Sequence, residues 1–326
     1  MVRVRGTMSF DFRAPNLNDL YAPVSITSTG FVDRLTLGPQ TGTQLVTKGN
    51  AGLTPEIAHT YTLGVVLTPD FIPGLTTSLD YYVTHMTNAI TNISYQNTTV
   101  QDLCIGSAPS YGSPYCLLAT RPVAPGQPGY NATTNYPTQI LSSPLNSANI
   151  QMEGWNFEID YNFDFADVWS AIPGTVTLRH LVTYEPVFET QNLPGTPYSW
   201  ATLPKTRMTS FINYTVGDWS LDIQNQWLSG WKKNNTPITA TNQNYAVPRI
   251  TSYDAMDVTI ARRFDMWGGS STLYFNVQNI GNTRAPLFPT NNSNPGLFYP
   301  VSGSTGPGFG YNDMGRYFTI GLKGNF

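Results

Sequence analysis

Apolar and polar side chains alternate without error over residues 155–165. One face carries Trp155, Phe157, Ile159, Tyr161, Phe163 and Phe165, and the other carries Asn156, Glu158, Asp160, Asn162 and Asp164. A period of two over this length excludes a helix, whose apolar face repeats every 3.6 residues. The alternation therefore predicts a long β-strand, and its recurrence along the chain predicts an all-β protein.

Ten segments show this pattern and are predicted to be strands. They are residues 2–13, 57–68, 75–89, 151–165, 174–185, 205–216, 219–231, 251–264, 272–281 and 315–326. All of them exceed the roughly 5–6 residues of an ordinary strand. A tilted strand of about 9–11 residues is what crosses the hydrocarbon core of a bilayer.

The connections between these strands alternate strictly between long and short. The short ones are residues 69–74, 166–173, 217–218 and 265–271, and the long ones are residues 14–56, 90–150, 186–204, 232–250 and 282–314. Up-and-down barrels of outer membranes have short periplasmic turns and long external loops, whereas a soluble Greek-key sandwich has no reason to sort its loops this way. The sequence thus predicts a transmembrane antiparallel up-and-down β-barrel.

Tryptophans lie near both ends of the predicted strands. Trp169, Trp219 and Trp267 are near short turns, and Trp155 and Trp231 are near long loops. Membrane–water interfaces collect such amphipathic rings. The alternative is that these tryptophans cap the strands of a soluble sheet.

Composition excludes several classes of protein. Charged residues make up 11% of the 326 residues, against about 25% in soluble domains, and the net charge is −3. A nucleic-acid partner is not expected, because such proteins carry basic surfaces. No uninterrupted apolar segment reaches the length of about 18 residues that a membrane-spanning helix needs.

The sequence offers little that predicts catalysis. Glu158 and Asp160 share one face, but a solvated wall inside a barrel explains them better than paired acid–base chemistry. His59, His85 and His180 lack the spacing of metal ligands. We therefore expect no enzyme activity, no metal site and no cofactor.

Two cysteines, Cys104 and Cys116, lie close together in a stretch rich in Gly, Ser, Pro and Tyr. Redox-type spacing and metal-ligand neighbours are both missing, which favours a disulfide over two unrelated thiols. A disulfide would place this stretch in an oxidising compartment.

Five segments, in order, resemble elements of TonB-dependent outer-membrane receptors. Phe12–Tyr21 reads F-R-A-P-N-L-N-D-L-Y, and Gly49–Glu56 reads G-N-A-G-L-T-P-E, with Ala51 where the family usually has Pro. The matching positions are Arg13, Ala14, Pro15, Asn16, Gly49, Asn50, Pro55 and Glu56. The other three are Ile72–Leu75 leading to Asp80, Gln278–Asn282, where Gly281-Asn282 departs from the usual Phe-Asp, and Gly315–Phe326.

The resemblance implies a receptor in the outer membrane of a Gram-negative bacterium that imports a scarce ligand with energy from the TonB complex. Family members place a signal peptide, a TonB box and a plug before a barrel of about 22 strands. We therefore expect residues 1–326 to be the C-terminal portion of such a barrel, about ten strands, without plug or signal peptide. TonB would then act through that absent plug.

The last strand carries a signal of its own. Phe318, Ile320, Leu322 and the terminal Phe326 resemble the pattern read by the barrel-assembly machinery. An ordinary amphipathic strand that ends in Phe is the alternative.

The longest predicted loop is the candidate for ligand contact. It carries five tyrosines and one arginine, namely Tyr95, Tyr111, Tyr115, Tyr130, Tyr136 and Arg121. Rings stack on sugar-like ligands and amides bind them, although each ring could equally pack the loop itself. A siderophore or a cofactor remains open as the ligand, as does a second class of function, a secreted β-rich adhesin or carbohydrate-binding protein.

Overall fold

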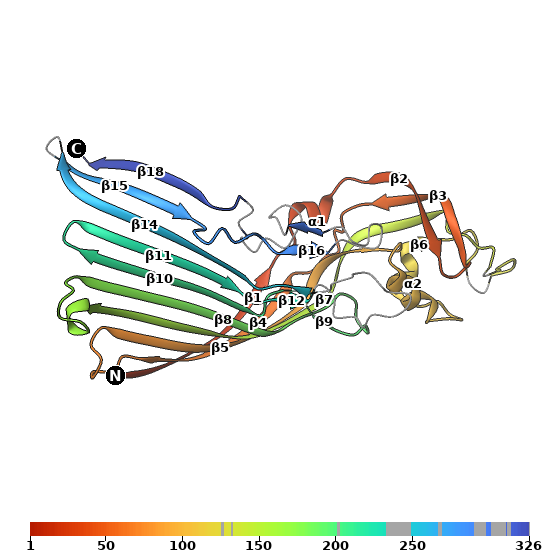
Figure 1. The fold of residues 1–326 in the computed structure, drawn as a ribbon. Coiled ribbons are helices and arrows are strands. Elements are labelled where there is room, and N and C mark those ends of the chain that lie inside the picture. The colour runs from red at the N-terminus through yellow and green to blue at the C-terminus, as the bar shows by residue number, and fades with distance from the viewer. Residues whose placement is uncertain are drawn as a thin grey trace.

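The computed structural model describes residues 1–124, 127–131, 133–200, 203–232, 249–266, 269–289, 298–300, 311 and 314–325. Ten long strands, each hydrogen-bonded to the next in chain order, form one antiparallel path (Figure 1). They are β1 (Val2–Arg13), β4 (Glu56–Leu67), β5 (Leu75–Ser94), β7 (Gln139–Asp164), β8 (Thr175–Gln191), β10 (Thr206–Val216), β11 (Trp219–Leu228), β14 (Tyr253–Met266), β15 (Gly269–Gln278) and β18 (Tyr317–Asn325). These strands confirm all ten predicted segments.

The sheet is a partial barrel that does not close. Among the described residues β1 and β18 do not pair, so they form its two edges. Both chain ends lie at the end of the sheet that carries the short turns (Figure 1). No helix in the described part of the chain is long and apolar enough to cross a membrane.

One face of the sheet is apolar and open to the surroundings. The register places Met8 opposite Tyr61 and Tyr61 opposite Val83, so apolar rows continue from strand to strand. Phe10 is 58% exposed and Ile320 is 73% exposed on this face. Large apolar side chains in such continuous rows are stable against lipid and costly in water.

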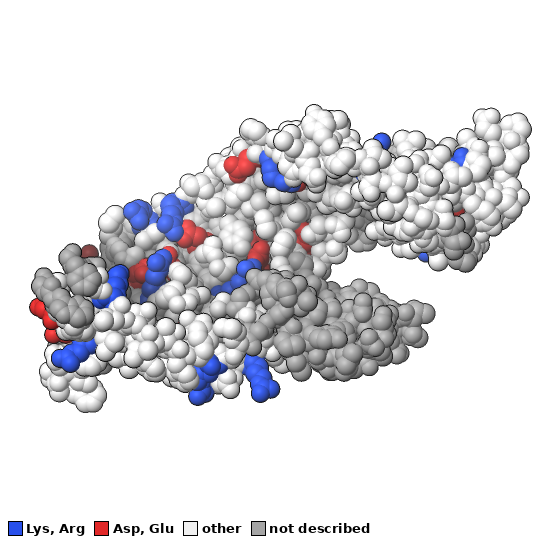
Figure 2. Space-filling view, turned by 90° about the horizontal axis from the view of Figure 1, so that it is seen from above, with Lys and Arg blue, Asp and Glu red and all other residues white. Residues whose placement is uncertain are grey.

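The opposite face is polar and is held together by cross-strand ion pairs and hydrogen bonds. Arg5 on β1 reaches across β4 to Asp80 on β5, with Nε 2.7 Å from Oδ1. Gly64 makes this possible, because a Cβ there would lie 1.8 Å from the same Oδ1. Figure 2 shows positive and negative side chains interleaved over the spanning strands.

Tryptophans follow the predicted pattern in part. Trp155 packs against Tyr81 with ring centroids 4.7 Å apart, while Trp169 and Trp219 lie exposed at the short-turn end. Trp231 is only 7% exposed, so its predicted place at the lipid interface is wrong. Trp267 lies outside the described residues.

The two longest connections are more ordered than predicted. β5 and β7 run past the spanning sheet after a bulge between Met86 and Ala89. They join β2 (Ser25–Asp33), β3 (Gly38–Thr47), which pairs parallel with β7, and β6 (Ala119–Thr120). We call β2, β3, β6, the ends of β5 and β7 beyond this bulge, and the connecting helices α2 (Thr98–Ile105) and η1 (Pro114–Leu118) the outer lobe.

The remaining elements are short. They are α1 (Leu17–Tyr21), η2 (Phe165–Asp167), β9 (Ser199–Trp200), the pair β12 (Trp231–Lys232) and β13 (Arg249–Ile250), and the pair β16 (Leu287–Pro289) and β17 (Phe298–Pro300).

The apolar core of the described chain lies in the outer lobe. It contains Ile93, Tyr95, Val100, Cys104, Leu118 and Ile140, and Leu193 packs onto it from the connection after β8. The lobe therefore packs as a small globular unit, whereas the spanning strands leave their apolar side chains on the surface.

Candidate functional site

The family-like motif residues form a clasp at the base of the outer lobe. Arg13, the last residue of β1, is paired with Glu56, the first residue of β4, and their side chains form an ion pair. The second carboxylate oxygen of Glu56 accepts the backbone N–H of Ile90 at 2.7 Å. The clasp thus ties together the ends of both long connections.

The helix α1 is the second part of this clasp. The Asn16 side chain caps it by accepting a hydrogen bond from the Asp19 N–H at 2.8 Å. The Asp19 carboxylate in turn accepts one from the Asn16 N–H at 3.2 Å. The Asn50 N–H donates to the Asp19 carbonyl at 2.8 Å. Gly49 passes so close to Ala22 that a Cβ would lie 2.6 Å from its nitrogen.

The remaining motif residues connect these groups. Asn50 donates from Nδ2 to the Pro144 carbonyl at 3.0 Å and so reaches β7. Ala14 and Pro15 lead from β1 to the helix cap, and Pro55 leads into β4. All eight motif positions therefore lie in or beside contacts that organise the chain.

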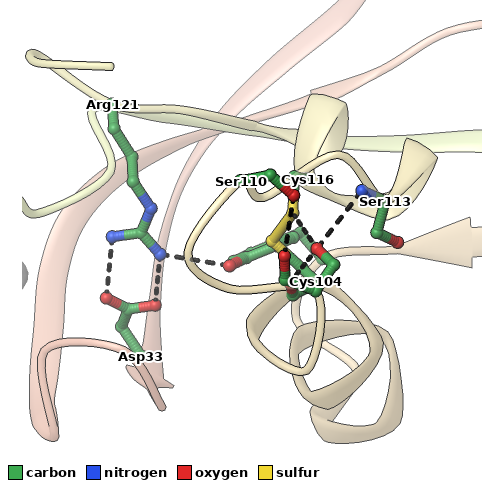
Figure 3. Close-up of a disulfide and its surroundings, with 8 residues drawn as sticks. Asp33, Cys104, Ser110, Ser113, Cys116 and Arg121 are labelled. Carbon is green, nitrogen blue, oxygen red and sulfur yellow. Dashed lines mark hydrogen bonds and ion pairs between the residues drawn. A yellow bond between two sulfur atoms is a disulfide. The ribbon is translucent and has the colours of Figure 1, made fainter. Parts of the chain in front are cut away.

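Cys104 and Cys116 are joined in a disulfide with Cα atoms 4.8 Å apart (Figure 3). The bond links α2 to η1, and Cys104 belongs to the lobe core. Ser107 donates from Oγ to the Cys104 carbonyl at 2.6 Å. The predicted pair thus crosslinks the outer lobe.

A buried ion pair lies beside the disulfide. Arg121 contacts Asp33 through both terminal nitrogens, at 3.0 Å and 2.7 Å (Figure 3). The same guanidinium donates to the Asn135 carbonyl at 2.7 Å and to the Tyr95 hydroxyl at 3.1 Å. The side chain of Asp33 is fully buried and that of Arg121 is 11% exposed.

The environment of this pair shifts its titration. Burial alone would raise the pKa of Asp33, but hydrogen bonds from Arg121 and Thr36 outweigh burial and lower it. Burial likewise opposes the charge on Arg121, and its contacts with Asp33 and Tyr95 raise its pKa nonetheless. Both groups therefore stay charged over the physiological pH range.

A pocket of about 390 Å³ opens next to this pair. Tyr111, Tyr130, Arg121 and the disulfide line it. Burial raises the pKa of Tyr130 to about 12, so its phenol stays protonated. The pocket can hold a small ligand beside the contacting rings of Tyr111 and Tyr130, and the cation in its described lining, Arg121, is already neutralised by Asp33.

The six predicted ligand-contact residues divide into three groups. Tyr95 is fully buried in the lobe core, and Tyr115 is partly buried against that core. Tyr111, Tyr130 and Arg121 line the pocket described above. Tyr136 lines a separate, polar hollow of about 600 Å³ beside Thr43 and Gln44.

Glu158 and Asp160, the two carboxylates that share one face of their strand, lie beside an arginine. Arg179 forms ion pairs with both, from Nη2 to Glu158 Oε1 at 2.6 Å and from Nε to Asp160 Oδ1 at 3.6 Å. Among the described residues no group of three or more His, Cys, Asp or Glu gathers in a way that could hold a metal ion.

A family model described as "TonB dependent receptor-like, beta-barrel" matches residues 2–280. The chain belongs to this family. TonB-dependent receptors are receptors and transporters of the outer membrane, and an incomplete barrel with an elaborate lobe at one end agrees with that assignment. No curated protein matches the chain.

Solved structures of TonB-dependent receptors share the fold. A mutant of the ferric enterobactin receptor PfeA from Pseudomonas aeruginosa superposes with a TM-score of 0.60 at 15% identity, over 99% of this chain and 38% of that chain. The siderophore receptor PirA from Acinetobacter baumannii gives 0.59 and 14%, over 99% and 39%. The chain thus spans less than two fifths of the length of these receptors.

Sequence reasoning missed several residues that shape the site. Asp33 lies 88 positions before its partner Arg121 in the sequence, and nothing nearby indicates the pairing. Gln101, fully buried, ties α2 to β2 by donating from Nε2 to the Val32 carbonyl at 3.2 Å, and it accepts the N–H of Arg34, just after β2, at 2.8 Å. The sequence signal for Gln101 was its place next to Val100 and three residues before Cys104, on the side of the short helix that becomes buried.

Proposed function

We propose that this chain is the C-terminal portion, residues 1–326, of the barrel of an outer-membrane receptor that imports a scarce ligand with energy from the TonB complex. The observation that carries the proposal is the family match over residues 2–280, together with an exposed apolar face on strands long enough to span a bilayer. The chain would reside in the outer membrane, in contact with its lipid.

The open edges point to the rest of the barrel. Unpaired backbone groups in lipid cost several kcal/mol each, so β1 and β18 need strands to pair with. A plug inside the completed barrel would contact the polar face and connect the receptor to TonB.

The last strand supports contact with the barrel-assembly machinery. Phe318, Ile320 and Leu322 are 62%, 73% and 55% exposed on one face of β18. Phe326 lies outside the described residues.

The ligand would enter from the side of the outer lobe. The face of the lobe that Figure 2 shows carries few charged side chains, which favours a neutral or weakly charged ligand at this surface. A sugar-like molecule, a siderophore and a cofactor remain the candidates, and the names of PfeA and PirA support the siderophore.

The alternative, a secreted adhesin or carbohydrate-binding protein, fits less well. In water the apolar face would expose Phe10, Phe12, Ile320 and Leu322 together, all more than half accessible. Soluble proteins rarely leave such rows uncovered.

The test is uptake by cells that express the full-length receptor containing residues 1–326. Labelled maltotriose, ferric enterobactin and cyanocobalamin are offered to matched strains with and without TonB. We expect saturable uptake of at least one compound that is lost without TonB. Recovery of the protein in the culture medium, with no uptake of any of the three, would contradict the proposal.

A further inference from the structure

A polar pocket lies on the polar face of the sheet, at the end from which the long connections leave. It has a volume of about 250 Å³ and is formed where β11, β14, β15 and β18 come together. Its polar lining comes from six side chains, Gln224, Gln226, Gln278, Asp257, Tyr253 and Tyr317.

The register explains why a hollow forms there. Gln226 is paired with Ala255 and Gln224 with Asp257. Ala255 has the shortest side chain in this row and leaves space in front of the two glutamines. Gln278 is paired with Tyr317 on the far side, so glutamines line the hollow from both sides.

The amides of this pocket differ from the others on the polar face. Asn213 donates to Asp222 at 2.5 Å, Asn276 donates to Thr259 at 2.8 Å, and Asn156 accepts from Thr183 at 2.9 Å. The side chains of Gln224 and Gln226, by contrast, make no hydrogen bond to any described residue, and the same holds for Gln278 and for the Tyr317 hydroxyl.

Asp257 adds an acceptor with spare capacity. One of its oxygens accepts the Asn279 N–H at 2.7 Å, and the other has no hydrogen-bond donor within the described chain. The described lining contains no cation, and the nearby Arg207 is occupied by Glu185 at 2.9 Å. An anionic ligand would therefore meet an uncompensated negative charge.

We infer that this pocket binds one ring of a neutral, polyhydroxylated ligand of the saccharide class. Each amide offers a donor and an acceptor side by side, which matches adjacent hydroxyl groups, and the Asp257 carboxylate accepts from a further hydroxyl. Tyr253 is buried at the floor of the hollow, and the Tyr317 hydroxyl is a further group that can donate to or accept from the ligand. The inference rests on the proposed receptor function and specifies its ligand.

The size of the pocket limits what it holds. Pockets for whole drug-sized ligands have volumes of about 300–1,000 Å³. At about 250 Å³ this one accommodates part of a larger molecule. It is therefore a subsite in the wall of the barrel, separate from the pocket beside the disulfide.

The experiment measures binding to the purified full-length receptor by calorimetry. The probes are four neutral trisaccharides (maltotriose, cellotriose, xylotriose and tri-N-acetylchitotriose) and, as an anion, ferric enterobactin. The variants are Gln226→Ala and Gln278→Ala. The matched control is Gln151→Ala. Gln151 lies on β7, in the cross-strand row that carries Phe10 on the apolar face of the sheet, away from the pocket.

We expect at least one trisaccharide to bind and each pocket variant to weaken it about 3- to 10-fold, the value of one hydrogen bond. Gln151→Ala should bind like the unmodified receptor. Equal binding by all variants would overturn the pocket as the site.

Failure of all four trisaccharides to bind would overturn the ligand class. TonB-dependent uptake of ferric enterobactin or cyanocobalamin in the same receptor would then leave the receptor function intact, so the two failures are distinguishable.

Discussion

Replacing Arg121 with methionine should destabilise the outer lobe and leave the spanning strands unchanged. The substitution keeps an unbranched side chain that can fill the aliphatic part of the Arg121 site, but it removes both bonds to Asp33. Asp33 is fully buried, so its charge would stay in the lobe without a counterion. Removing one partner of a buried ion pair costs about 3–5 kcal/mol.

Arg34→Met is the matched control, because the same change removes an ion pair from the same lobe. Arg34 and Asp102 are each about half exposed, and an exposed pair contributes about 0–1 kcal/mol. The double variant Arg121→Met/Asp33→Asn should recover part of the loss, because it removes the buried charge.

Hydrogen exchange of the full-length receptor measures this directly. We expect the amides of α2 and of β7 near Ile140 to exchange about 100-fold faster or more in Arg121→Met. Exchange in β10 and β11 should not change. Equal protection of the lobe in Arg121→Met and Arg34→Met would refute the reasoning.

The pH dependence of the stability of the outer lobe is a second test of the Asp33–Arg121 ion pair. The pKa of Asp33 is lowered in the folded lobe, so the stability it provides is present above the unfolded value of about 3.9 and is lost below it. In Arg121→Met, burial without a partner should raise this pKa instead. The variant lobe should therefore become more stable as the pH falls from 7 towards 4.

Two further changes have expected outcomes. Replacing Cys104 and Cys116 with serine should weaken the outer lobe by about 3 kcal/mol, seen as faster exchange of its amides, without altering urea unfolding of the barrel. Gly64→Ala should displace Asp80 and lower the stability of the barrel in urea by about 1–3 kcal/mol, whereas Gly6→Ala, with 3.4 Å to the nearest atom, should be neutral. Unfolding curves that coincide for the two glycine variants would contradict the account of the Arg5–Asp80 contact.

The spanning strands were predictable because each carries its own signal. The alternation of apolar and polar residues is visible within each strand. A one-residue shift in register would turn every apolar side chain to the wrong face, so a segment such as Trp155–Phe165 is compatible with only one orientation of its two faces. The order of the strands followed from the length of the connections. The boundaries at the long-loop end were less accurate: β7 begins at Gln139 instead of residue 151.

The outer lobe was not predictable in the same way. β2 reads Ser-Ile-Thr-Ser-Thr-Gly-Phe-Val-Asp, with little alternation, because it forms by pairing with β3 and by packing on a distant core. β3 in turn pairs in parallel with β7, about 95 residues further along the chain. Such long-range contacts leave no local pattern.

The candidate site shows the same division. The two cysteines were close in sequence and could be paired by elimination. The roles of Tyr95 and Arg121 depended on Asp33, and their burial emerges only when β2, β5 and β6 come together. The polar pocket between β11, β14, β15 and β18 was not predicted, because Gln224 and Gln226 are ordinary residues for the polar face of a strand.

The central claim is that these strands cross the outer membrane with the outer lobe outside. Thr133, exposed on the lobe, and Ser170, exposed at a short turn, are each replaced with cysteine in the full-length receptor. The native cysteines are joined in a disulfide and give little background. A membrane-impermeant maleimide should label Thr133→Cys in intact cells and Ser170→Cys only after permeabilisation, whereas labelling of Ser170→Cys in intact cells would contradict the claim.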